Sequence, residues 1–162
     1  MTEILNRISQ QTNKWVEFVL ASFGISMACI VALQVFCRYA LNHSLFWSEE
    51  LARYLLVWLS FLGATAAYYR RVHPSIDILT QHLSIRLQKY CRVFVYLVAM
   101  GFFLVMIYFG GQFAYFVRAQ ISPALAIPKW ILFLIIPISG TLFLLHCITF
   151  LVSELRERDD DN

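Results

Sequence analysis

Four runs of mostly apolar residues recur along the chain, separated by shorter segments that hold most of the charged residues. The runs cover residues 15–37, 51–69, 93–117 and 130–152. About 18 or more consecutive apolar residues suffice for a helix that crosses the hydrocarbon core of a bilayer. We therefore predict an all-α integral membrane protein with four transmembrane helices, folded as a single membrane domain over residues 1–162.

The segment between the second and third runs has the periodicity of a helix with one apolar face. Its apolar residues recur at steps of three and four: Ile76, Leu79, Leu83, Leu87 and Tyr90. The basic residues Arg86, Lys89 and Arg92 lie off that stripe. We predict an amphipathic helix over residues 75–92 that lies in the membrane interface. An ordinary solvated connector that docks on the bundle is the alternative.

The composition agrees with a membrane protein. Hydrophobic residues make up 60% of the chain and charged residues 14%, whereas soluble domains have about 45–50% apolar and about 25% charged residues. A formal net charge of +3 is too small to suggest a nucleic-acid partner. The four cysteines have no paired spacing, so we expect neither a disulfide framework nor a metal site.

The basic residues are distributed unevenly over the segments between the runs. Nine lie before the first run, between the second and third, or after the fourth: Arg7, Lys14, Arg70, Arg71, Arg86, Lys89, Arg92, Arg156 and Arg158. Four lie on the opposite side: Arg38, Arg53, Arg118 and Lys129. Because cytoplasmic loops are enriched in Lys and Arg, this bias places both termini in the cytoplasm.

The second run predicts a helix with a small-residue face. Ser48 is the expected N-cap, with Glu49 and Glu50 in the first turn, where the helix dipole favours acidic residues. Steps of four and three then place a possible Glu49–Arg53 ion pair and a strip of small residues on one face: Ser60, Gly63 and Ala67. Small residues allow helix backbones to approach closely in a bilayer. We expect this face to be a packing face and Thr65, on the other side, to meet lipid.

The first run carries a similar strip, Gly24-x-x-x-Ala28-x-x-x-Ala32. Two strips in neighbouring runs favour tight packing of the first helix on the second, or of both on a partner.

Charged residues cluster near the ends of the runs. We expect Arg70 and Arg71 to be snorkelling anchors and Glu17 to be an end residue. Acidic residues snorkel poorly, so Glu49 and Glu50 beside Trp47 are interpreted as a contact surface, either for a membrane partner or for a periplasmic one.

Deep polar groups are few: Gln34, Gln112, Ser139, Thr141 and His146. Ion and substrate paths are normally lined by clustered polar groups or a buried carboxylate. We therefore expect no transport path in this chain by itself, no enzymatic activity, and a His146 that is hydrogen-bonded within the bundle.

Residues 38–79 also carry a combination that resembles the signature of a known family, the small (Q-type) membrane subunit of tripartite ATP-independent periplasmic (TRAP) transporters. The residues are Arg38, Trp47-Ser48-Glu49-Glu50-Leu51-x-Arg53, Trp58, Gly63-Ala64, Arg70 and His73-x-x-x-Asp77. The length, the four spans and the cytoplasmic termini agree with this family. Pro74 is a departure, because the family more often has a branched aliphatic residue after the histidine.

The resemblance implies a subunit of a sodium-dependent importer in the bacterial inner membrane. In the family, a large membrane subunit carries the sodium and substrate sites and moves part of itself like an elevator. A periplasmic substrate-binding protein captures an organic acid such as a C4-dicarboxylate or a sialic acid. The small subunit packs on the large one and broadens its fixed scaffold, so the resemblance implies no cofactor on this chain.

Two other classes of protein fit parts of the pattern. A haem-binding anchor of a respiratory enzyme needs two axial histidines on facing helices, whereas only His146 of the four histidines lies within a run. A self-sufficient small exporter needs a membrane-embedded carboxylate, and Glu17 lies near the end of its run.

Overall fold

The computed structural model of the chain describes residues 2–70 and 85–156. Its helices are α1 (Thr2–Ala40), α2 (Phe46–Tyr69), α4 (Ile85–Phe116), the short 3-10 helix η1 (Val117–Ala119), α5 (Trp130–Phe133) and α6 (Ile135–Arg156). Four of the described helical stretches are long and apolar enough to cross a membrane: Glu3–Ala40, Phe46–Tyr69, Tyr90–Ala119 and Trp130–Leu155. The prediction of an all-α fold with four spans is confirmed.

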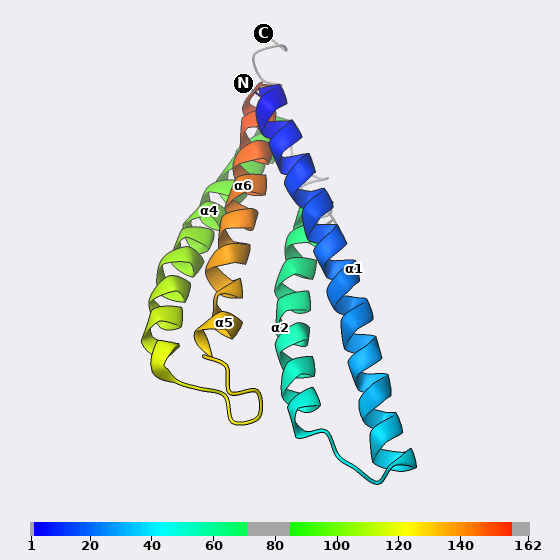
Figure 1. Cartoon of the computed structure of the whole chain (residues 1–162). Helices are drawn as coiled ribbons and strands as arrows, with labels where there is room; N and C mark the ends of the chain where they lie inside the picture. The colour runs from blue at the N-terminus through cyan, green and yellow to red at the C-terminus, as the bar shows by residue number, and fades with distance from the viewer. Residues whose placement is uncertain (1, 71–84, 157–162) are drawn as a thin grey trace.

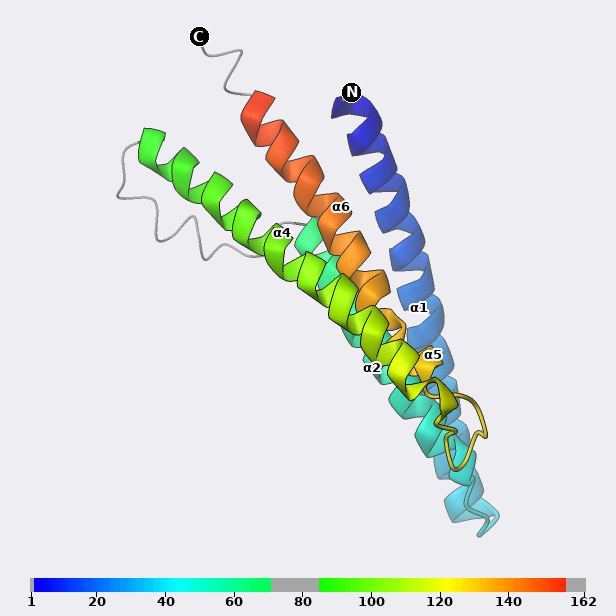
Figure 2. The same ribbon diagram turned by 90° about the vertical axis from the view of Figure 1, so that its left-hand side faces the viewer.

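The four long helices form two pairs that run side by side (Figures 1 and 2). Helices α1 and α2 are joined by residues 41–45, and α4 and α6 are joined through η1, residues 120–129 and α5. Both connections lie at the same end of the bundle, which we call the loop end. The start of α1 and the end of α6 lie at the opposite end, which we call the terminal end. Helix α6 contacts each of the other three long helices, so it is the centre of the packing.

The first boundary of α2 differs from the prediction. The helix begins at Phe46 with Leu45 as its N-cap, and no side chain caps it. Ser48 is fully buried, and its hydroxyl donates to the carbonyl of Leu45 at 2.6 Å. Because this hydroxyl is bonded back to the preceding turn, Ser48 is not the expected cap. Glu49 does lie in the first turn, as predicted, whereas Glu50, also predicted there, lies just beyond it because the helix begins earlier.

The predicted interfacial helix falls partly outside the described residues. Residues 75–84, which include Asp77, lie outside the described residues, and so does His73. Residues 85–92, in contrast, form the first turns of α4 and continue directly into the third span. No proline interrupts Ile85–Phe116, so nothing breaks the helical hydrogen bonds at the expected boundary after residue 92. At this end Arg92 Nε donates to Glu154 Oε1 at 2.9 Å, which ties α4 to α6.

An aromatic cluster joins α2, α4 and α6. The ring of Tyr68 lies 5.6 Å from that of Phe103 and 5.5 Å from that of Phe143, both in edge-to-face geometry. Phe103 and Phe143 stack at 4.9 Å. Since such pairs add to simple burial, the cluster fixes the relative position of these three helices.

Two glycines lie where helices α4 and α6 are in close contact. A Cβ atom on Gly110 would lie 2.7 Å from Ile136 Cγ2, and one on Gly140 would lie 3.0 Å from Ile107 Cγ1. Both distances are shorter than ordinary van der Waals contacts, so a side chain at either position would force its neighbours to shift. The close helix approach that small residues permit in membranes therefore occurs here, between α4 and α6.

Replacing Gly110 by leucine tests this contact. Gly110→Leu should lower the thermal unfolding temperature of the purified chain by several degrees, because overpacking costs about 1–3 kcal/mol. Gly101→Leu is the matched control, since a Cβ atom on Gly101 meets nothing within 4 Å. An equal effect of both substitutions would contradict the assignment of Gly110 to the α4–α6 contact.

Candidate functional site

At the loop end, Glu50 holds the connection between η1 and α5 against the start of α2. Its Oε2 accepts the backbone N–H groups of Ala124 at 2.8 Å and Leu125 at 3.0 Å. Its Oε1 accepts the hydroxyl of Tyr54 at 3.3 Å. The contacts with Ala124 and Leu125 join residues more than 70 positions apart in the sequence. The Glu50 carboxylate therefore forms its hydrogen bonds within the chain, whereas we had expected it to face a partner.

The loop that Glu50 binds has its own internal hydrogen bonds. The N–H of Ser122 donates to the carbonyl of Ile127 at 2.9 Å, and that of Lys129 donates to Gln120 at 2.9 Å. Ala126 has a φ of 54°, a left-handed conformation that closes the turn. Glu50 thus fixes a preformed loop to α2 instead of ordering a loose one.

The other residues predicted at the loop end face outward. Arg38, in the last turn of α1, and Arg53 are exposed, and Trp47 is 38% exposed. Glu49 Oε1 accepts Gln34 Nε2 at 3.2 Å. The expected Glu49–Arg53 ion pair is not formed: the ion pairs found among residues 2–70 and 85–156 are Glu17–Arg70 and Arg92–Glu154. The loop end therefore presents a mixed aromatic and charged surface.

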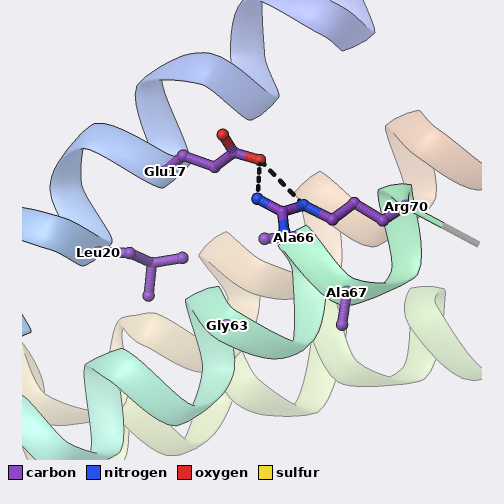
Figure 3. Close-up of a pocket in the computed structure, with 6 residues that line it drawn as sticks. All are labelled: Glu17, Leu20, Gly63, Ala66, Ala67 and Arg70. Carbon is purple, nitrogen blue, oxygen red and sulfur yellow. Dashed lines mark hydrogen bonds and ion pairs between the residues drawn. The ribbon is translucent and has the colours of Figure 1, made fainter. Parts of the chain in front are cut away.

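At the terminal end, Glu17 of α1 pairs with Arg70, which follows α2 (Figure 3). Glu17 Oε1 accepts Arg70 Nη2 at 2.8 Å and Nε at 3.3 Å, and it also accepts Asn13 Nδ2 at 2.9 Å. We expected Arg70 to be a snorkelling anchor and Glu17 to be an end residue, and neither expectation included this ion pair. The antiparallel α1–α2 pair brings them together, although they are 53 positions apart.

Next to this ion pair, α1 and α2 form an open groove. It is lined by Leu20 together with Gly63, Ala66 and Ala67 (Figure 3). A Cβ atom on Gly63 would meet only Leu20 Cδ2, at 4.0 Å, and one on Gly24 would meet nothing within 4 Å. The two small-residue strips thus do not pack tightly on each other. Of the two alternatives that their spacing allows, packing on a partner is the one left open.

The inner face of α2 is rotated from the predicted one. Its buried residues are Ser48, Leu62, Thr65 and Ala66. Thr65, which we expected to meet lipid, is fully buried, and its hydroxyl donates to the carbonyl of Leu62 at 2.7 Å. A hydroxyl satisfied by its own helix can be buried at little cost, so the polar side chain gave a misleading signal. A repeat of apolar residues at Leu62, Ala66 and Tyr69 was the better indicator.

The predicted packing face of α2 is largely exposed in the chain. Arg53 and Ser60 are exposed, and Gly63 and Ala67 are half-buried. Ala64, which belongs to the family signature and not to this face, is exposed as well. Trp58 is half-buried and its ring lies 6.1 Å from that of Phe23 on α1. Most of this face is therefore available to something outside the chain.

His146 is fully buried and bonded within the bundle, as predicted. Its Nδ1 lies 2.7 Å from the hydroxyl oxygen of Ser9, which is also buried. His43, the other histidine that the structure describes, lies in the connection at the loop end. These two histidines are at opposite ends of the bundle, so they do not form an axial pair for haem.

Comparison with known proteins identifies relatives of the whole bundle. A family model described as tripartite ATP-independent periplasmic transporters, DctQ component, matches residues 27–157. A Haemophilus influenzae protein with the provisional name TRAP transporter small permease is 34% identical over 80 residues, 49% of this chain and 50% of that protein. The sialic acid TRAP transporter permease SiaT of another Haemophilus influenzae strain is 36% identical over 56% of this chain and 14% of its own length.

A third relative is the C4-dicarboxylate TRAP transporter small permease DctQ of Vibrio cholerae. It is 29% identical over 52% of this chain and 36% of its own length. The matched segments thus span half or less of these three relatives.

The contact made by Glu50 generates a prediction about the loop. Glu50→Leu should speed hydrogen exchange of the Ala124 and Leu125 amides by about tenfold or more, because both lose a charged acceptor. Hydrogen exchange with mass spectrometry on the chain in lipid nanodiscs measures this. Glu49→Leu is the control and should leave both amides protected, since Glu49 accepts only Gln34 in the described structure. Unchanged protection in Glu50→Leu would show that the loop does not depend on this carboxylate.

Proposed function

The chain belongs to the DctQ component family of TRAP transporters, and from this we propose that it is the small permease subunit of a sodium-dependent organic-acid importer. The observation that carries the proposal is the match of the family model to residues 27–157, which include most of a four-span helical bundle. The proposed location is the bacterial inner membrane. The bias of nine basic residues against four supports a cytoplasmic terminal end and a periplasmic loop end.

We place the sodium and substrate sites on a large membrane subunit. The hydroxyl groups of Ser22, Ser26, Ser60 and Thr141 each donate to a carbonyl one turn earlier in their own helix. Locally satisfied hydroxyls do not form the row of converging oxygens that a desolvated ion requires. We therefore propose a supporting role for the chain. A separate periplasmic protein would deliver the organic acid to the large subunit.

The outer face of α1 and α2 is the proposed contact with the large subunit. Helix α2 exposes Ser60 and Ala64 beside the groove at Gly63, and α1 exposes Ala28 and Ala32. Helix α4 exposes large apolar or aromatic side chains: Leu97, Phe102, Leu104, Tyr108 and Phe109. Helix α1 exposes large side chains too, such as Phe18 and Ile25, so the proposed contact is limited to the part of α1 that carries Ala28 and Ala32 and to the small-residue face of α2. Small residues favour helix contacts and bulky ones suit lipid. The relative SiaT, of which the match covers only 14%, supports close association with a larger permease part.

Reconstitution tests the supporting role. Proteoliposomes with both membrane subunits, the binding protein and a sodium gradient should take up an organic acid, with C4-dicarboxylates and sialic acid as the first candidates. Proteoliposomes with this chain alone should show background uptake, because its described spans bond their hydroxyls internally. Substantial uptake by the chain alone would overturn the proposal.

Paired glycine substitutions test the contact face. Gly63→Leu should reduce recovery of the large subunit in co-purification by about tenfold, because it fills a face that needs close approach. Gly101→Leu adds the same bulk on α4, where a Cβ atom meets nothing within 4 Å, and should leave recovery unchanged. Both variants should keep the unfolding temperature of the isolated chain. Loss of the complex in Gly101→Leu alone would place the contact on α4.

A further inference from the structure

Two buried polar atoms at the terminal end have no hydrogen-bonding partner among residues 2–70 and 85–156. They are His146 Nε2 on α6 and Asn13 Oδ1 on α1. The side chain of His146 is fully buried and Asn13 is 5% exposed. Unpaired buried donors and acceptors are rare in folded proteins because each loses its bonds to water. Each of these two atoms therefore needs a hydrogen-bonding partner that the described side chains do not supply.

Helix geometry places the two side chains at neighbouring levels of α1 and α6. Ser9, which contacts the His146 ring, lies one turn before Asn13 on the same buried face of α1. Side chains tilt toward the N-terminus of their own helix. Helices α1 and α6 are antiparallel (Figure 1). The side chain of Asn13 therefore leans toward the terminal end, where Ser9 lies, and the side chain of His146 leans toward the loop end, in the direction of Asn13. The Tyr69 ring, 5.1 Å from the His146 ring, lies against it from α2.

The hydrogen bonds already present assign the chemical character of both atoms. Asn13 Nδ2 donates to Glu17, so Oδ1 is an acceptor. The Ser9 hydroxyl lies 2.7 Å from Nδ1 and is buried. If the hydroxyl accepted a hydrogen bond from Nδ1–H, its own hydrogen would have no acceptor in this contact. Ser9 therefore donates to Nδ1, and in a neutral imidazole Nε2 then carries the proton.

We propose that a single internal water molecule bridges His146 and Asn13, accepting from Nε2–H and donating to Oδ1. Buried waters typically satisfy two to four otherwise unpaired polar groups, and this site offers one donor and one acceptor. The water completes a hydrogen-bonded chain from Ser9 through His146, Asn13 and Glu17 to Arg70. That chain links α6, α1 and α2 at the terminal end, independently of any transport role.

Nitrogen NMR of the intact chain tests the water. The chain is labelled with nitrogen-15 histidine, placed in lipid nanodiscs and studied by magic-angle spinning, and the His146 signals are those lost in His146→Gln. The expected result is an unprotonated Nδ1 and a protonated Nε2 that receives magnetisation from water. Absence of transfer from water to the Nε2 proton of the parent chain would overturn the proposal.

Two substitutions identify the second partner of the water. Asn13→Leu removes the acceptor and should abolish the transfer from water to Nε2 while the Nδ1 signal keeps its shift. Glu17→Gln, the matched control, changes the partner of Asn13 Nδ2 but leaves Oδ1 in place, and should retain the transfer. Retention in Asn13→Leu would overturn the bridge.

Discussion

The structure depends on one constraint: inside a bilayer, each polar group must find a partner within the protein or in a water molecule that the protein encloses. Helices satisfy this for the backbone, which is why the four described spans are helical over their length. The same constraint acts on side chains. Thr65 and Ser139 are fully buried, and their hydroxyls donate to carbonyls of their own helices. Polar residues within these spans therefore need not mark a pathway.

Packing between the helices is uneven, and the unevenness separates internal from external faces. Helices α4 and α6 meet closely at Gly110 and Gly140, and the Tyr68 cluster adds α2 to this pair. The groove at Gly63, between α1 and α2, has no such close contact. A glycine on an open helix face lets the backbone of another helix approach closely. The open groove at Gly63 therefore agrees with the proposed contact with a large subunit.

Polar contacts join the helices at both ends of the bundle. At the loop end, Glu50 binds two backbone amides of the η1–α5 connection. At the terminal end, the pairs Glu17–Arg70 and Arg92–Glu154 connect α1 to the end of α2 and α4 to α6. Exposed ion pairs contribute little stability, but partners fixed at both ends limit how the helices slide along each other. This restraint is compatible with the supporting role that we propose for the chain.

The sequence by itself determined the membrane class, the four spans and the acidic first turn of α2, because these depend on apolar run length and local preference. It also indicated the buried hydrogen bond of His146. Only the tertiary structure decided which way α2 faces, that Glu50 binds Ala124 and that Glu17 pairs with Arg70. Those contacts join residues more than 50 positions apart, and their formation depends on helix rotation, which a pattern of small and polar residues along one helix does not specify.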